Sequence, residues 1–262
     1  MKPTLQETRE IWERISVWWD QAIGEGNDFQ RALIIPATDQ LLEPGPDQLI
    51  LDVACGNGNY SRHLAKLGAR VLACDYCHGI LERAREKVLA DADRIEYRVI
   101  DATDDAQLLA LGESRFDSAV CSMAMMDMPT VEPLLHALPK LLKPGGRFVF
   151  SISHPCFNSS NARLTAELNQ GDGKSRQVFG VAVDKYLSAQ TNLSAGILNQ
   201  PEPHYLFHRP LSAIFAACFQ AGFVINGLLE PAYPAGTSAK NLFSWARRPE
   251  IPPAIVVRLR LA

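Results

Sequence analysis

The stretch DVACGNGN, residues 52–59, stands where a buried strand gives way to a helix. An apolar run from Leu49 to Ala54 leads into it, and a segment of helical pattern follows it as far as Leu67. Glycines at 56 and 58 allow a tight turn and a close approach to a ligand, and the first turn of the following helix offers N–H groups that have no partner within the helix. The sequence therefore predicts a site for a nucleotide-like ligand at this turn.

Strands and helices alternate from this stretch onward. Such alternation is typical of successive βα units and predicts an α/β fold with one doubly wound, mostly parallel sheet. The helix after the second strand carries Leu81, Ala84, Val88 and Leu89 on one face. The expected strands after the first are Ala69–Cys74, Ile95–Ile100, Phe116–Cys121, Arg147–Ile152, Phe223–Leu229 and Ile255–Leu261.

Two parts of the chain do not follow this pattern. Residues 1–46 contain two helical segments, and residues 47–262 hold the sheet. Between the fifth and sixth strands, residues 155–209 are rich in Asn, Ser, Gln, Gly and Thr. A structureless stretch of this length inside a compact domain is usually functional or disordered, and its aromatic residues favour function. Those aromatics are Phe157, Phe179, Tyr186, Tyr205 and Phe207.

Acidic residues stand at the ends of the second and third expected strands, at the same edge of the sheet as the glycine turn. Asp75 ends the second strand, where a carboxylate can accept hydrogen bonds from ribose hydroxyls, and Asp101 ends the third. Each acid could instead cap a helix. A nicotinamide-dinucleotide site is the main alternative for the glycine turn, but its fingerprint requires glycine or alanine where this chain has Ser61.

Together these features resemble the class I S-adenosylmethionine-dependent methyltransferase family, from about Asp52 to Phe150. The resemblance implies a seven-stranded sheet of order 3-2-1-4-5-7-6 with N-terminal helices and an insertion after strand 5. It also implies S-adenosyl-L-methionine as the cofactor. The implied cofactor contacts are Asp52, Ala54, Cys55, Gly56 and Gly58 for the methionine part, Asp75 for the ribose, Tyr76, Asp101 and Ala102 for the adenine, and Cys121 and Ser122 at the end of the fourth strand.

Two departures from the family pattern matter. Ala54 stands where the family often has the first glycine of its loop. After the fourth strand, residues 123–129 replace the Asp/Asn-Pro-Pro-aromatic motif of the enzymes that methylate the amino groups of bases or glutamine. This difference disfavours those nitrogen acceptors.

The resemblance also assigns roles to the two irregular parts of the chain. Similar enzymes cover the cofactor with an N-terminal helix that bears an aromatic-Asp pair, so residues 1–46 are expected to form a lid with Trp19 in contact with the cofactor. Related small-molecule methyltransferases insert substrate-covering elements after the fifth strand. Residues 155–209 are therefore expected to enclose the acceptor.

Methyl transfer from a sulfonium is an in-line displacement that depends mainly on alignment and water exclusion. A base near the acceptor would help if the acceptor is a hydroxyl or a protonated amine. His154 after the fifth strand and Asp127 after the fourth are the candidate catalytic residues, with His204 and His208 as further candidates, and each could be structural instead. The predicted reaction is methyl transfer to oxygen or nitrogen, rather than carbon, of a small molecule.

The composition of the chain bears on its partners, its location and metal binding. The net charge of -3 and the pI near 6.1 disfavour a nucleic-acid partner. The absence of an export signal and of a long apolar run predicts a cytoplasmic protein without membrane contact. Cys74 and Cys77 form a Cys-x-x-Cys pair, but no second pair accompanies it, so no metal is expected. An RNA or protein methyltransferase, or a protein that binds the cofactor without transferring its methyl group, remain the alternative functions.

Overall fold

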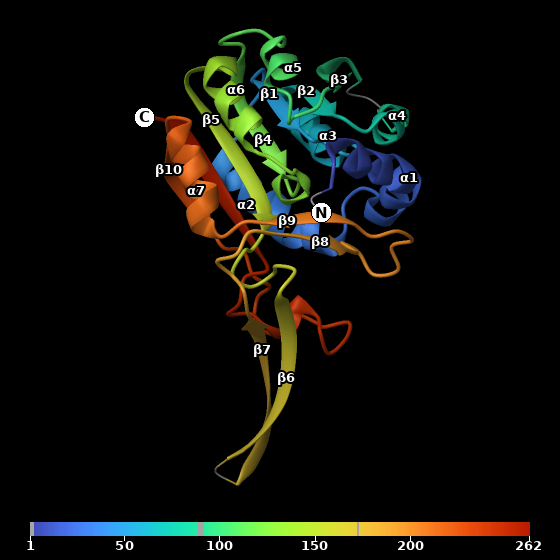
Figure 1. Cartoon of the computed structure of the whole chain (residues 1–262), viewed down its shortest axis with the longest axis vertical. Coiled ribbons are helices and arrows are strands. Elements are labelled where there is room, and N and C mark those ends of the chain that lie inside the picture. The colour runs from blue at the N-terminus through green and yellow to red at the C-terminus, as the bar shows by residue number, and fades with distance from the viewer. Residues whose placement is uncertain (1–2, 88–91, 172) are drawn as a thin grey trace.

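The computed structural model describes residues 3–87, 92–171 and 173–262. Its body is built around a seven-stranded sheet in the order β10-β11-β5-β4-β1-β2-β3 (Figure 1). The five strands from β1 to β5 run parallel, and β11 is antiparallel to both β5 and β10. The predicted order is confirmed, with β10 and β11 as the sixth and seventh strands. The strand bounds are β1 Leu49–Val53, β2 Arg70–Asp75, β3 Ile95–Val99, β4 Phe116–Ser122, β5 Leu142–Ser153, β10 Phe223–Leu229 and β11 Ala254–Leu261.

The register of the parallel strands brings distant residues to one edge. Val53 pairs with Cys74, and Asp75 pairs with Val99, so the loops after β1, β2 and β3 all leave the sheet at the same edge. Ser122 at the end of β4 pairs with Ser151 of β5. Because carboxyl ends of parallel strands meet at this edge, it is the expected place for a ligand.

Helix α1, Leu5–Ile23, lies over this edge. Thr4 and Glu7 form a capping box at its start. Glu13 on α1 accepts hydrogen bonds from the backbone N–H groups of His78 and Gly79 at 2.7 and 2.9 Å. These groups begin α4, His78–Glu86, so one carboxylate joins the two helices. Leu81 and Ala84 are buried on the inner face of α4, as predicted, whereas Val88 and Leu89 lie outside the described residues.

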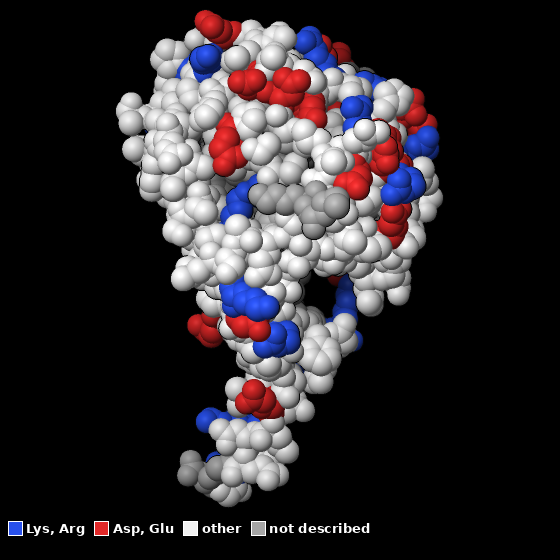
Figure 2. All heavy atoms as spheres, in the orientation of Figure 1, with Lys and Arg blue, Asp and Glu red and all other residues white. Residues whose placement is uncertain are grey.

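The segment 155–209 is more regular than its sequence indicates. It forms two hairpins, β6 Ala162–Gly171 with β7 Lys174–Val183, and β8 Gln190–Ser194 with β9 His204–His208. The β6–β7 hairpin projects from the body, whereas β9 lies against α1 and the loop after β4 (Figures 1 and 2). Residues 174–178 of β7 are exposed on both faces, so they carry no apolar alternation that would reveal a strand.

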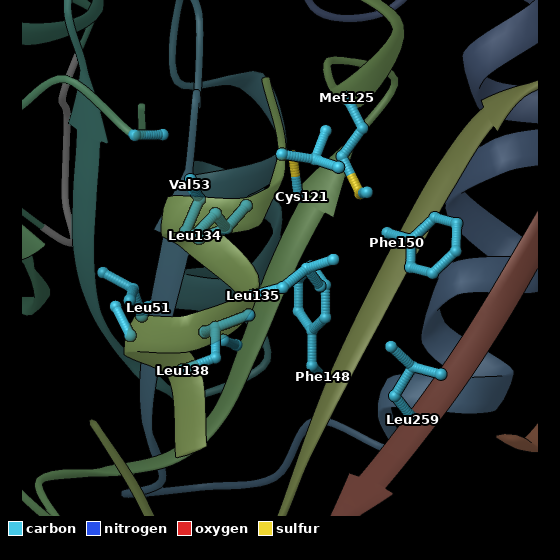
Figure 3. Close-up of a cluster of buried hydrophobic side chains, with 14 of the residues drawn as sticks. Leu51, Val53, Cys121, Met125, Leu134, Leu135, Leu138, Phe148, Phe150 and Leu259 are labelled. Atoms are coloured by element: carbon cyan, nitrogen blue, oxygen red, sulfur yellow. The ribbon is translucent and has the colours of Figure 1, made fainter. Parts of the chain in front are cut away.

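Two hydrophobic layers cover the two faces of the sheet. Leu51 belongs to one layer and Ile50 to the other, as expected for neighbouring residues of a strand. Figure 3 shows Leu134, Leu135 and Leu138 of α6 packed over the first layer. The helices of this layer are α5 Asp105–Leu109, α6 Glu132–Leu141 and α7 Leu211–Gln220, and those of the opposite layer are α2 Ile35–Leu42 and α3 Asn59–Lys66.

The remaining turns are short. A π-helical turn, η1 Gln30–Ile34, runs directly into α2, and Pro36 stands at the start of that helix. The 3-10 turns are η2 Ala92–Arg94, η3 Met125–Asp127 and η4 Trp245–Arg247. In the described part of the chain, no helix combines the length and the apolar character needed to cross a bilayer.

Candidate active site

A cavity opens at the carboxyl edge of the sheet, beneath α1. Residues at or after the ends of four strands line it, together with α1 and single turns of other helices, which places segments from distant parts of the sequence around one space. The principal lining residues are Trp12 and Trp19 of α1; Asp52, Ala54, Cys55, Gly56 and Asn57 after β1; Asp75, Tyr76 and Cys77 after β2; Asp101, Ala102 and Thr103 after β3; and Ser122, Met123, Ala124, Asp127, Met128 and Pro129 after β4.

The glycine turn has the left-handed backbone that its sequence predicts. Gly56 and Gly58 have φ angles of 56° and 71°, and Ala54 shares this region with a φ of 52°. A Cβ atom on Gly58 would stand 2.3 Å from the Tyr97 hydroxyl, so this glycine is needed for packing between α3 and β3. Gly58 does not line the cavity, in contrast to its predicted role as a cofactor contact.

Two buried carboxylates hold the turn in place. Asp52 accepts a hydrogen bond from the Ser61 hydroxyl at 2.5 Å. Asp75 accepts from the N–H of Gly56 and from the N–H of Cys77, each at 2.9 Å. Burial raises the pKa of Asp52 to about 7 and that of Asp75 to about 6. Each oxygen of Asp75 has a second lone pair, so the carboxylate can still accept from ribose hydroxyls.

The adenine end of the expected cofactor site lies after β2 and β3. Tyr76 and Asp101 both line the cavity. Asp101 accepts hydrogen bonds from the N–H and the hydroxyl of Thr103 at 2.8 and 2.6 Å, which orients its side chain. The Tyr76 hydroxyl is buried and has no hydrogen-bond partner among the described residues. Such an orphaned polar group fits a site that a polar ligand completes.

An aromatic cluster closes the cavity from above. The rings of Trp12 and Trp19 pack edge to face with centroids 4.9 Å apart, and the ring of His204 on β9 lies 4.7 Å from that of Trp12. Asp20 accepts a hydrogen bond from the Asn57 side chain at 2.9 Å, which joins α1 to the glycine turn. Trp12 is absent from the predicted site, although it precedes Trp19 by two turns of the same helix and therefore shares its face.

Asp127 and His204 meet at the wall of this cavity. Asp127 Oδ1 lies 3.5 Å from His204 Nε2 and has no hydrogen-bond partner among the described residues. The Gln200 amide nitrogen donates to His204 Nδ1 at 2.9 Å, so in the neutral ring the proton lies on Nε2, facing Asp127. Burial raises the pKa of Asp127, and His204 opposes this change.

His154 and Cys121 occupy other positions. His154 is 2% exposed, contacts Glu230 through Nε2 at 2.8 Å and accepts the N–H of Cys156 at Nδ1. Both ring nitrogens are engaged and the residue does not line the cavity, so the structure gives no support to its predicted role as a base. Cys121 is buried in the core below the rim. None of the predicted wall aromatics of 155–209 lines this cavity either.

The charges around the cavity suit a cationic ligand. The acidic side chains that line it within the described residues are Asp52, Asp75, Asp101 and Asp127, and no Lys or Arg accompanies them. A sulfonium cation such as that of S-adenosyl-L-methionine is favoured in such a field. Over the same described ranges, no group of three His, Cys, Asp or Glu side chains is placed to hold a metal ion.

Comparison with known proteins agrees with this geometry. A family model described as a methyltransferase domain matches residues 51–150. A demethylmenaquinone methyltransferase of Clavibacter sepedonicus is 37% identical over 142 residues, which are 53% of this chain and 55% of the relative. A ubiquinone biosynthesis O-methyltransferase of Hydrogenovibrio crunogenus is 32% identical over 139 residues, 52% of this chain and 55% of the relative. The chain thus spans about half the length of these curated relatives.

A solved structure extends the likeness over nearly the whole fold. The crystal structure of an S-adenosylmethionine-dependent methyltransferase from Mesorhizobium loti superposes with a TM-score of 0.66 at 26% identity, over 86% of this chain and 96% of that chain. Sheet order and rim residues together define a Rossmann-like methyltransferase fold. Residues 51–150 thus belong to the methyltransferase-domain family, and the fold of the whole chain is that of the class I S-adenosylmethionine-dependent methyltransferases, whose methyl donor is S-adenosyl-L-methionine.

Proposed function

We propose that this chain transfers a methyl group from S-adenosyl-L-methionine to an oxygen or nitrogen atom of a small molecule. The observation that carries the proposal is a single cavity in which the acidic rim of β1 to β3 faces two tryptophans of α1 and the carboxylate of Asp127, which lies 3.5 Å from His204 Nε2. When bound, the cofactor supplies a methyl carbon on a sulfonium, which an acceptor atom displaces in line.

In this proposal, some residues around the cavity bind the cofactor, and others accept the proton or position the residue that accepts it. Asp75 and Asp101 accept hydrogen bonds from the cofactor, and Trp12 and Trp19 exclude water above it. Asp127 accepts the proton that the acceptor loses, since its carboxylate lines the cavity and burial raises its pKa. His204 is a positioning residue that faces this carboxylate from β9.

Several features favour a small acceptor over RNA. The carboxylates of the cavity would repel phosphates, and α1 covers it with Trp12 and Trp19. On the face in Figure 2, lysine and arginine side chains are scattered among acidic ones and form no continuous basic patch. The name of the Hydrogenovibrio relative specifies methylation at oxygen, which supports oxygen as an acceptor atom here.

Calorimetry tests the cofactor assignment. We expect S-adenosylhomocysteine to bind the wild-type chain and Asp75→Ala to weaken this binding by about 1 to 3 kcal/mol, because ribose hydroxyls would lose a buried charged partner. The matched control is Asp117→Ala, a carboxylate at the opposite end of β4 that pairs with Lys143. Binding of NAD without binding of S-adenosylhomocysteine would contradict the assignment.

Acceptor profiling tests the reaction. A panel of small hydroxylated and amine-bearing metabolites, incubated with methyl-labelled cofactor, should yield at least one labelled product. With that acceptor, Asp127→Asn should lower kcat by about a hundredfold or more while S-adenosylhomocysteine binding is unchanged. His154→Gln serves as the control and should retain kcat. Labelling of RNA alone, or of no compound at all, would overturn the proposal in favour of an RNA methyltransferase or of a non-catalytic binding protein.

A further inference from the structure

A second cavity lies on the other side of the loop between β4 and α6. Met125, Met126 and Val131 of this loop face it, whereas Met123, Ala124 and Asp127 of the same loop line the first cavity. Its other walls come from the end of β5, the segment between β5 and β6, the β8–β9 hairpin with Arg209 after it, and α7. They include Ile152, Ser153, Ser159, Ser194, Phe207, Arg209 and Ile214.

Arg209 is the only charged side chain among the described residues that line this second cavity. Its Nη2 donates to the Met128 carbonyl at 2.7 Å, and Nη1 makes longer contacts of 3.4 Å with the carbonyls of Met125 and Phe207. A guanidinium carries five N–H donors, so these three contacts leave two without a protein partner. No described carboxylate lies within ion-pair distance of it.

The nearest acid that influences Arg209 is already engaged. Glu132 attracts the guanidinium electrostatically, but its Oε2 accepts hydrogen bonds from the Thr130 hydroxyl and the Val131 N–H at 2.5 and 3.0 Å. Burial lowers the pKa of Arg209, which reflects the cost of holding its charge away from water. The Ser159 hydroxyl in the same cavity is buried and has no hydrogen-bond partner in the described part of the chain. An anion in the cavity would supply partners for such donors, because partly desolvated charges and buried polar atoms require them.

The two cavities therefore differ in charge. The first is lined by four acidic side chains, and the second by one guanidinium, the His208 ring, the Asn158 amide, hydroxyls and apolar side chains. The carbonyls of Met125 and Met128, which Arg209 contacts, lie on either side of Asp127 in the sequence. A carboxylate at Arg209 would thus be held beside the loop that carries the proposed base.

We infer that the second cavity binds a small amphipathic acid, with its carboxylate on Arg209 and its apolar body against Ile152, Phe207 and Ile214. The anion site itself depends only on the residues of the second cavity.

Ligand-observed NMR titration of the full chain with hexanoate and its neutral isostere hexanamide tests the site. Hexanoate should bind about tenfold more tightly than hexanamide, since only the anion pairs with the guanidinium. Arg209→Gln should remove this preference, and Arg209→Lys should retain part of it. Ser194→Phe, which fills the cavity and leaves Arg209 in place, should weaken both probes by about tenfold or more.

Binding of S-adenosylhomocysteine to each variant separates the two proposals. All three variants should bind it as the wild-type chain does, which also shows that they are folded. Equal binding of hexanoate and hexanamide to a wild-type chain that binds S-adenosylhomocysteine would overturn the anion site alone. Unchanged hexanoate preference in Arg209→Gln would do the same. Loss of S-adenosylhomocysteine binding by the wild-type chain would instead overturn the methyltransferase proposal.

Discussion

At the residue scale, Ala54 shows how the turn departs from the family pattern. The family often has glycine at this position, and Ala54 retains the left-handed backbone that glycine adopts without strain. A Cβ atom in this conformation costs about 1 to 2 kcal/mol, because it approaches the following carbonyl oxygen. Neighbouring hydrogen bonds, including that from the Cys55 N–H to the Cys74 carbonyl at 2.9 Å, hold the strained residue in place.

Replacing Ala54 by glycine should therefore stabilise the chain. We expect Ala54→Gly to raise the free energy of unfolding by about 0.5 to 1 kcal/mol, since relief of strain exceeds the added entropy of the unfolded chain. Urea denaturation measures the change. Gly56→Ala is the matched control, because its φ is also positive and no atom lies within 4 Å of the added Cβ. It should lower stability, and a destabilised Ala54→Gly would contradict the argument.

The raised pKa of Asp52 predicts how stability changes with pH. The folded chain keeps this proton up to about pH 7, whereas an ordinary aspartate loses it near 3.8. The folded state thus holds more protons between these values, so this residue makes the free energy of unfolding fall as the pH rises from about 4 to 7. Denaturation at several pH values should show a flatter dependence for Asp52→Asn. Identical slopes for both proteins would show that Asp52 ionises normally.

At the element scale, the two hairpins of the insertion have different surroundings. The sequence predicts that all of 155–209 covers the acceptor, but only the β8–β9 hairpin reaches the lid. His204 on β9 packs against Trp12 and Trp19 of α1. The β6–β7 hairpin leaves the body instead (Figure 1). A two-stranded hairpin without a packed face has little stability of its own, so its distal part should open readily.

Hydrogen exchange should distinguish the two hairpins. On addition of S-adenosylhomocysteine, exchange should slow in α1 and in β8–β9, because the ligand contacts Trp19 and stabilises the helix that packs on β9. Exchange in residues 166–178 of the projecting hairpin should not change, which provides an internal control. Equal protection of both hairpins would favour the original prediction that the whole insertion acts as one lid.

At the scale of the whole molecule, one arginine holds the projecting hairpin to the body. Arg248, from the segment before β11, is 2% exposed and donates to the carbonyls of Thr165 and Gly180 at 2.8 and 3.0 Å. Its guanidinium also lies 5.7 Å from the centroid of the Phe179 ring. The base of the hairpin thus belongs to the folded body, while residues beyond Glu167 and Val178 extend into solvent.

Shortening the hairpin should leave the rest of the fold intact. Replacing residues 168–177 by Asn-Gly would close the ladder at the Glu167 and Val178 pair with a two-residue turn. The Tm should change by less than about 4 °C, since little buried surface is lost. Arg248→Ala should lower the Tm more, because it removes a buried side chain and its hydrogen bonds to the carbonyls of Thr165 and Gly180. A large loss of stability on shortening would show that the distal hairpin packs in solution.

The sequence by itself determined the sheet and the cofactor rim. The signals that located them are local: apolar runs, the turn at Gly56 and the acids Asp52, Asp75 and Asp101. The carboxyl ends of parallel strands meet at one edge of a sheet, independently of the contacts made by the other segments. The strand order, which the family resemblance implied, is confirmed, and eleven of the fourteen predicted site residues line the first cavity, the exceptions being Gly58, Cys121 and His154.

Only the tertiary structure decided which distant side chains complete the site. His154 follows β5 as predicted, but contact with Glu230 directs its ring away from the cavity. His204 reaches Asp127, and Arg209 enters the second cavity, through a hairpin that the sequence pattern does not reveal. The direction of a side chain depends on packing partners that lie far away in sequence. A strand end has a predictable location, whereas the contacts of a loop residue emerge only when those partners fold together.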